Sequence, residues 1–191
     1  MNENNIIFLD IDGVLNDNKS NYSIHSINAL KKIINRYCAK LVLITSEQRN
    51  GTVERRNIVI NRLKQLGLEV YDFIDPNFEG DIIDIKLSSR VLGIVHYLKN
   101  NPVDNYLIID DDYHNDYKLL SLNHFKTRMF KGLLEKDLPK IKFKPVNLNN
   151  FKYVNYRYRQ LGEYEFFTNE LIKVLKKVYG NKNNWDVVFL F

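Results

Sequence analysis

The sequence predicts an α/β fold: a doubly wound, Rossmann-like parallel sheet covered by helices, with a C-terminal α+β extension. Two observations lead to this prediction. Short apolar runs of strand length alternate along the chain with helical patterns of roughly 10 to 15 residues. The runs are also apolar at nearly every position, rather than at every second one. Strands that are apolar on both sides are typical of parallel sheets buried between two layers of helices.

The first half of the chain supplies two strand and helix pairs. IIFLDI at 6–11 is the first predicted strand, and Ser23 is a predicted N-cap for a helix that ends near Tyr37. KLVLIT at 40–45 is the second strand, and a helix follows over 53–66. Gly67 suits the left-handed residue that terminates such a helix.

The second half continues the alternation and then changes character. Strands are predicted at 68–74, 105–110 and 122–127, with a helix at 87–98 between the first two. Beyond Pro145 basic and aromatic residues mix, a helix is predicted over 163–179, and WDVVFLF reads as a last strand. We expect one catalytic core at 1–139 and a basic, aromatic-rich extension at 140–191 packed on it.

Charge is distributed unevenly. Residues 1–139 carry 18 Lys and Arg against 19 Asp and Glu, whereas residues 140–191 carry 10 against 4. The whole positive excess therefore lies in the C-terminal segment, which favours binding of a polyanion such as nucleic acid. The competing interpretation is a solvated face, or an edge strand over the core. The pattern predicts no oligomeric state.

Several features bear on the compartment. No run of about 18 apolar residues exists, and the chain opens on the polar MNENN, so we expect a soluble, cytoplasmic protein without a membrane partner. Cys38 is the single cysteine, which excludes an internal disulfide and agrees with a reducing compartment. We expect it to be a small buried apolar group.

Polar residues follow three of the predicted strands: Asp10 and Asp12, then Thr45 and Ser46, then Asp110 to Asp112. In a parallel sheet these positions meet at the carboxyl edge, where ligands bind. So many carboxylates repel one another unless a cation is present, and Mg²⁺ is the usual cation for oxygen ligands. Asp10 is then a credible nucleophile towards phosphorus.

A fixed positive charge would complete such a site. Lys86 and Arg90 are four residues apart, so on a helix they share one face, and either could reach a phosphate. A hydroxyl of Thr45 or Ser46 could hold a phosphoryl oxygen. The inert interpretations are a turn at Asp12 and Gly13, a helix cap at Thr45 and Ser46, and an acidic helix start at 110–112.

The motifs of the chain resemble those of a known family. DIDGVLN at 10–16, LITS at 43–46, a basic residue at 86 or 90, and IIDDD at 108–112 are similar to the four motifs of the haloacid dehalogenase (HAD) superfamily. Its members are mostly Mg²⁺-dependent phosphatases. Over about residues 5–135, RVLGIVHYL and HFKTRMFKGLLEKD look most like the HAD-like domain of Swiss Army Knife RNA repair proteins.

The resemblance implies a role for each matching residue. Asp10 would be the nucleophile and a metal ligand, and Asp12 the general acid and then base, with its backbone carbonyl on the metal. Asp110 and Asp111 would complete the metal site, with Asp112 and Asp116 in reserve. The remaining roles concern the phosphate: Thr45 as the hydroxyl, Arg90 or Lys86 as the cation, and Gly13, Ser46 and Arg49 around it.

These expectations converge on a Mg²⁺-dependent phosphatase that acts through an aspartyl-phosphate, possible substrates being a nucleic-acid or nucleotide phosphate. The spacings between motifs leave no room for a cap domain, so we expect an open site that admits a large substrate. Two alternatives stay open. The fold could serve as a silent binding module, or it could transfer the phosphoryl group to an acceptor other than water.

Overall fold

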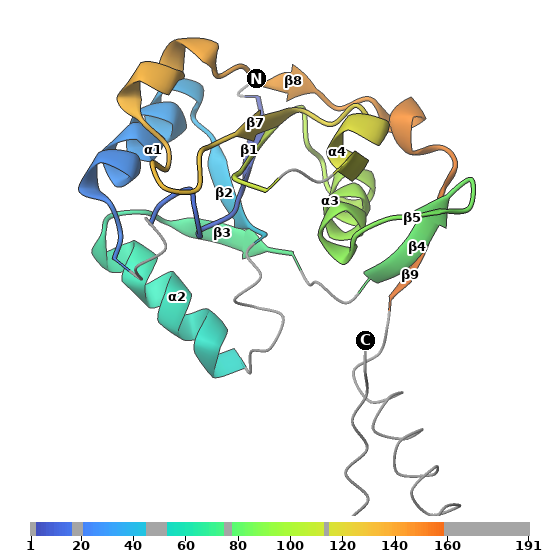
Figure 1. Cartoon of the computed structure of the whole chain (residues 1–191), viewed down its shortest axis with the longest axis horizontal. Helices are drawn as coiled ribbons and strands as arrows, with labels where there is room; N and C mark the ends of the chain where they lie inside the picture. Colours follow the sequence, from blue (N-terminus) through green and yellow to red (C-terminus); the bar gives the residue numbers. More distant parts are fainter. Residues whose placement is uncertain (1–2, 17–20, 45–52, 75–77, 113–114, 159–191) are drawn as a thin grey trace, which may run out of the picture. The chain divides into compact units, whose positions relative to one another are not determined.

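The computed structural model describes residues 3–16, 21–44, 53–74, 78–112 and 115–158. Its centre is a parallel sheet in the order β3-β2-β1-β6-β7 (Figure 1). The chain starts in the middle and winds outward in both directions, so the predicted doubly wound α/β fold is confirmed. The strands are β1 (Asn5–Leu9), β2 (Lys40–Leu43), β3 (Val70–Phe73), β6 (Asn105–Asp110) and β7 (His124–Lys126), and the short β8 (Lys144–Pro145) pairs antiparallel with β6.

Helices cover both faces of this sheet, and strand alternation decides which side chains they meet. In β1, Ile7 and Leu9 pack in one apolar core and Ile6 and Phe8 in the other. The first core holds the apolar faces of α1 and α2, the second those of α3 and α4. Even-numbered residues of β1 therefore face α3. The helices are α1 (Ile24–Tyr37), α2 (Val53–Gln65), α3 (Ser89–Asn100) and α4 (Asn115–Leu119).

Local signals explain where the helices begin and end. The Ser23 side chain caps α1 by accepting the N–H of Ser26, and Ser88 caps α3 in the same way. Gly67, with φ +73°, lies just after α2. Because α3 begins at Ser89, the helix starts two residues later than predicted. Cys38 ends α1 in a left-handed conformation and is exposed, so the expectation of a buried cysteine is wrong.

A second, antiparallel sheet was not predicted. It has the order β5-β4-β9 and consists of β5 (Ile85–Lys86), β4 (Phe78–Ile82) and β9 (Val154–Tyr158). The rings of Phe78 and Tyr156 pack against His96 of α3, with centroids 4.7 and 5.6 Å away. Local periodicity does not reveal this sheet, because β4 pairs with a strand more than 70 residues later along the chain.

Residues through Tyr158 form one compact unit. The segment after β7 packs on the core through two 3-10 helices, η2 (Glu135–Lys140) and η3 (Leu148–Phe151), and Phe151 is fully buried. The domain boundary at 139 stays a prediction. The helix predicted at 163–179 and the last strand lie outside the described residues. Within the described residues, no helix is both long and apolar enough to cross a membrane.

Candidate active site

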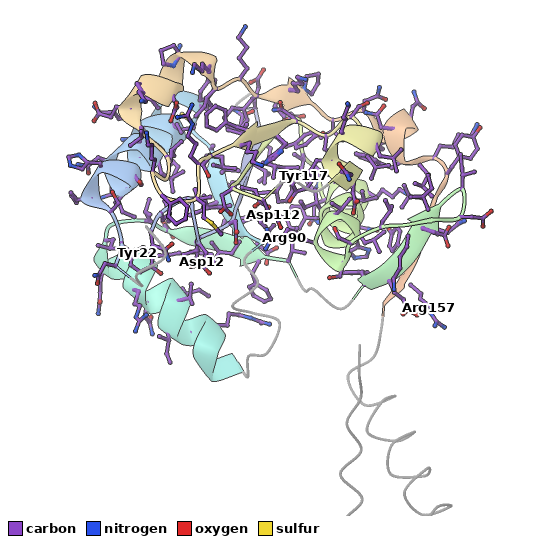
Figure 2. The ribbon with its side chains drawn as sticks, in the orientation of Figure 1. Asp12, Tyr22, Arg90, Asp112, Tyr117 and Arg157 are labelled. Carbon is purple, nitrogen blue, oxygen red and sulfur yellow. The ribbon has the colours of Figure 1, made fainter. Side chains whose placement is uncertain are left out.

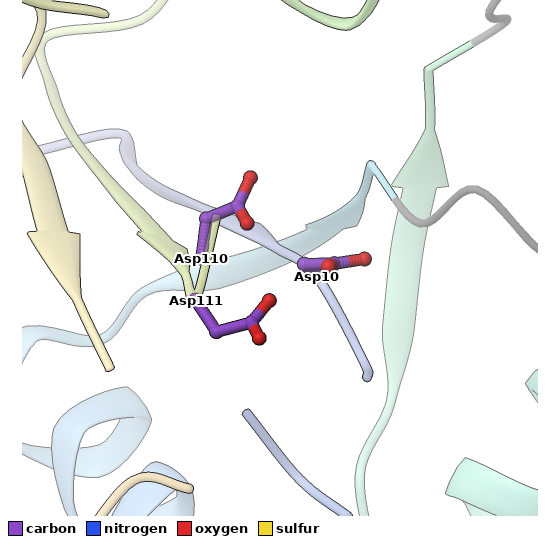
Figure 3. Close-up of side chains that lie close together, drawn as sticks. All are labelled: Asp10, Asp110 and Asp111. Carbon is purple, nitrogen blue, oxygen red and sulfur yellow. The ribbon is translucent and has the colours of Figure 1, made fainter. Parts of the chain in front are cut away.

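Three acidic side chains meet where β1 and β6 end side by side. Asp10 follows β1 on the same alternation as Ile6 and Phe8, and Asp110 is the last residue of β6. The Asp10 N–H donates to the carbonyl of Ile109 at 3.0 Å, which fixes the two strand ends together. One carboxylate oxygen from each of Asp10, Asp110 and Asp111 lies within 4.8 Å of the others, and Figure 3 shows the three groups converging.

Arg90 of α3 lies against this cluster. Its Nη1 is 2.6 Å from Oδ2 of Asp110 and 3.4 Å from Oδ2 of Asp10, and only 8% of its surface is exposed. Burial by itself lowers the pKa of the guanidinium, but the two carboxylates outweigh this effect, so the pKa of Arg90 is raised. The cation is therefore permanent, and it is held between two acids.

Asp110 is fully buried, and several donors hold it. The Tyr117 hydroxyl donates to Oδ2 at 2.7 Å, beside Arg90, and the N–H of Asp112 donates to Oδ1 at 2.9 Å. Burial, and then the charge of Asp110, raise the pKa of Tyr117 well above its ordinary value. Figure 2 shows Tyr117, Asp112 and Arg90 in this part of the molecule. Sequence reasoning missed Tyr117, whose only signal is its position in α4, the short helix that follows the acidic run.

The charge of Asp10 is compensated in part, since its Oδ2 lies 3.4 Å from Nη1 of Arg90. Its Oδ1 is buried and accepts no hydrogen bond from the described residues. Burial raises the pKa of Asp10 to about 7; Arg90 opposes the shift and Asp110 adds to it. A buried carboxylate oxygen without a donor, next to two more carboxylates, is a suitable ligand set for a hard divalent cation. The residues present therefore fit the expected metal.

The loop after β1 holds Asp12 beside the cluster. The Asn16 amide donates to Oδ1 of Asp12 at 2.7 Å and accepts the Gly13 N–H at 3.1 Å. Gly13 has φ +67°, and a Cβ there would lie 2.1 Å from Oδ2 of Asp111. Glycine is required here by the approach of Asp111, in addition to the turn that the sequence suggested. Sequence reasoning gave Asn16 no role.

A pocket of about 550 Å³ opens beside Asp10, Asp12 and Arg90. Asp116 lies outside the acid cluster and accepts the N–H of Ser88 at 2.7 Å, which anchors the start of α3. Thr45, Ser46 and Arg49 lie outside the described residues, so their assignments stay predictions. The pocket of about 550 Å³, called the acid pocket from here on, is lined by Asp10, Asp12, Arg90, Asp111, Asp112, Lys126, Thr127, Arg128 and Met129.

The structure separates the two candidate cations. Lys86 lies on β5, ahead of α3, so the helical spacing that grouped it with Arg90 does not apply. It is exposed and lines another pocket, of about 620 Å³, on the small sheet. That pocket is larger, but its acids and its lysine are exposed or only half-buried. Buried, mutually perturbed charges are the better mark of a chemical site, and they occur around Arg90.

The comparisons with known proteins agree with this geometry. Residues 6–138 match the family described as "HAD domain in Swiss Army Knife RNA repair proteins". No curated protein and no solved structure matches the chain significantly. The family match covers more than two thirds of the chain and includes both acidic strand ends and Arg90. The chain therefore belongs to the family of HAD domains found in Swiss Army Knife RNA repair proteins.

Proposed function

We propose that the chain is a Mg²⁺-dependent phosphohydrolase that transfers a phosphoryl group to Asp10 and then to water. The observation that carries this proposal is the environment of Asp10. Asp10 lines an open pocket, and its carboxylate has one oxygen near Arg90 and the other without a hydrogen bond from the described residues. A carboxylate placed in this way can act as a nucleophile.

The metal would be held by Asp10, Asp110 and Asp111. When bound, Mg²⁺ offsets negative charge on the carboxylates and on a phosphate. This matters for Asp10 because its pKa is raised to about 7, and only the ionised carboxylate attacks. Arg90 supplies part of the compensating charge and, through Asp110, keeps a fixed position beside the nucleophile.

The protein's own residues account for each bond that changes. An Asp10 oxygen attacks phosphorus as the bond from phosphorus to the ester oxygen breaks, and Asp12 gives its proton to the leaving oxygen. Asp12 then accepts a proton from water as that water attacks phosphorus and releases the Asp10 carboxylate. Asn16 donates to Oδ1 of Asp12, which leaves Oδ2 for the proton transfer.

Hydrolysis of para-nitrophenyl phosphate by the full chain tests the proposal. We expect turnover with Mg²⁺, none after chelation, and none for Asp10→Asn. Asp81→Asn, in the pocket of the small sheet, is the matched control and should keep the activity. Absence of turnover in the wild type, or retention in Asp10→Asn, contradicts the proposal. Less free phosphate than nitrophenol, in the presence of an alcohol, would instead indicate transfer to another acceptor.

A further inference from the structure

A turn after β7 is fixed against the loop that carries Asp12. The N–H of Thr127 donates to the carbonyl of Asp110 at 3.1 Å, and its hydroxyl donates to the carbonyl of Gly13 at 2.9 Å. On the far side of the turn, the Leu133 N–H donates to the carbonyl of Val14 at 2.9 Å. The turn is therefore tied at both ends to the candidate active site.

The turn itself presents apolar side chains to solvent. The N–H groups of Lys131 and Gly132 both donate to the carbonyl of Arg128, which closes it tightly. Met129 is 49% exposed and Phe130 is 77% exposed, the largest fraction for any large apolar side chain in the described part of the chain. Met129 also lines the acid pocket. Phe130 thus exposes its ring on a well-anchored turn, next to a residue that lines the site and between the basic residues Arg128 and Lys131.

A basic pocket of about 450 Å³ continues from the acid pocket, and the two share Lys126, Thr127 and Arg128. One acid, Asp137, faces five cations in this lining, and its Oδ2 already accepts the N–H of Leu134. The other acid of the segment, Glu135, pairs with Lys32 at 2.7 Å. The five cations are Lys126, Arg128, Lys131, Lys136 and Lys140.

We infer that the basic pocket and the Phe130 turn bind a single-stranded polynucleotide whose phosphorylated end occupies the acid pocket. The inference rests on the proposed function and names its substrate class. Cations along a continuous path attract the phosphates beyond the reacting one, and an exposed aromatic ring lets a terminal base stack. The surface offers both, whereas a small phosphate ester would use neither. The role predicted for the basic segment 140–191 shares only Lys140 with this surface and stays a prediction.

Binding of a short, fluorescent, single-stranded oligonucleotide with a terminal phosphate, followed by anisotropy, tests the inference without turnover. The background is the full chain carrying Asp10→Asn. Adding Phe130→Ala should weaken binding about tenfold. Adding Lys136→Ala and Lys140→Ala should weaken it and make the slope of log affinity against log salt shallower by about 1.4.

Another pocket, at the opposite edge of the large sheet, provides matched controls. There Tyr71 is 59% exposed beside Lys31 and Lys40, so Tyr71→Ala and the double change Lys31→Ala with Lys40→Ala remove the same chemistry. We expect affinity to stay within about twofold of the Asp10→Asn background for both. Equal losses in the controls, or no loss in the Phe130 and lysine variants, overturn the inference.

Turnover separates this inference from the proposed function. For turnover, Phe130→Ala is made in the chain that keeps Asp10. The ratio of kcat/KM for the oligonucleotide to kcat/KM for para-nitrophenyl phosphate should then be about tenfold lower than in the wild type. A serine phosphopeptide serves as the competing substrate. If Phe130→Ala lowers kcat/KM for the phosphopeptide as much as for the oligonucleotide, the polynucleotide assignment is wrong. If aryl phosphate is not hydrolysed at all but the binding losses persist, only the proposed function fails.

Discussion

The carboxyl edge of the large sheet and the small sheet β5-β4-β9 both place acids and cations beside a pocket. They differ in how deeply the charged side chains are buried. At the large sheet Asp10, Asp110 and Arg90 are each less than 10% exposed and in mutual contact. At the small sheet the ion pair of Arg157 with Glu79 leaves the arginine side chain 79% exposed. Figure 2 shows Arg157 well away from Arg90. The burial of its charges, rather than the size of its pocket, is what makes the large sheet's edge the better candidate for chemistry.

The largest contrast is expected between Arg90 and Lys86. Arg90→Ala leaves two buried carboxylates without their cation and should lower the free energy of unfolding by about 3 to 5 kcal/mol. Lys86→Ala removes an exposed charge and should change it by less than about 0.5 kcal/mol. Urea denaturation monitored by circular dichroism measures both. Arg90→Lys should be intermediate, because one ammonium cannot reproduce the planar guanidinium. Similar effects for Arg90→Ala and Lys86→Ala would erase the contrast.

The two regions should also respond to pH with opposite signs. The pKa of Asp10 lies above its ordinary 3.8, at about 7, so its contribution to stability is complete below pH 3.8 and is lost as the pH rises through 7. Burial lowers the pKa of His96, between Phe78 and Tyr156, below 6.5. Its contribution is complete above pH 6.5 and is lost as the pH falls through the lowered value.

Unfolding of the metal-free protein at a series of pH values measures these two contributions, each about 1.4 kcal/mol per pKa unit before solvent screening. Asp10→Asn should remove the loss of stability that accompanies a rise in pH towards 7, and His96→Gln the loss that accompanies a fall in pH below 6.5. His96 is partly exposed, so its contribution should be the smaller. A pH profile that neither variant alters would contradict the opposite signs.

Two glycines give a finer comparison. A Cβ on Gly13 would lie 2.1 Å from Oδ2 of Asp111, whereas one on Gly80 would lie 2.0 Å from the carbonyl oxygen of Asn155 in β9. Gly13→Ala should displace a candidate metal ligand and lower aryl phosphate hydrolysis about 100-fold. Gly80→Ala should disrupt pairing in the small sheet and lower stability, with much less effect on the rate. If Gly80→Ala is as inactive as Gly13→Ala while still folded, the small sheet is not separate from catalysis.

The smallest expected difference concerns two tyrosine hydroxyls. Tyr117→Phe removes a hydrogen bond to the buried Asp110 carboxylate and should cost about 1.5 kcal/mol. For Tyr156 of the small sheet the described residues show ring contacts and no hydrogen bond of the hydroxyl, so Tyr156→Phe should cost less than about 0.5 kcal/mol. Denaturant midpoints decide between them, and a neutral Tyr117→Phe would mean that Arg90 and the Asp112 N–H hold Asp110 without the tyrosine.

The sequence predicted the large sheet well because its signals are local. Apolar runs locate the parallel strands, and the period of two along β1 already places Asp10 on the side of Ile6 and Phe8. Asp10 and Asp110 each follow such a run, so the amino-acid pattern alone was enough to bring these two acids together. The small sheet could not be predicted, since its strands pair over a long sequence separation and β5 has only two residues.

The sequence left the choice between Lys86 and Arg90 open. Both are basic and four residues apart, and only the start of α3 at Ser89 separates them. Asn16 and Tyr117 were not predicted, because the role of each depends on the acid that its side chain contacts. Neither the residue type nor its spacing indicates that contact. Hydrogen bonds that position another polar side chain can be identified only from the folded structure.

In the proposed reaction Asp10 receives the phosphoryl group. Borohydride reduces an aspartyl-phosphate to homoserine, so the enzyme would be treated with borohydride during turnover of aryl phosphate with Mg²⁺, and the peptide containing residue 10 analysed by mass spectrometry. We predict homoserine at position 10, dependent on both substrate and Mg²⁺, with Asp12, Asp110 and Asp111 unmodified. Turnover without homoserine at position 10, or homoserine at another of these acids, would contradict the account.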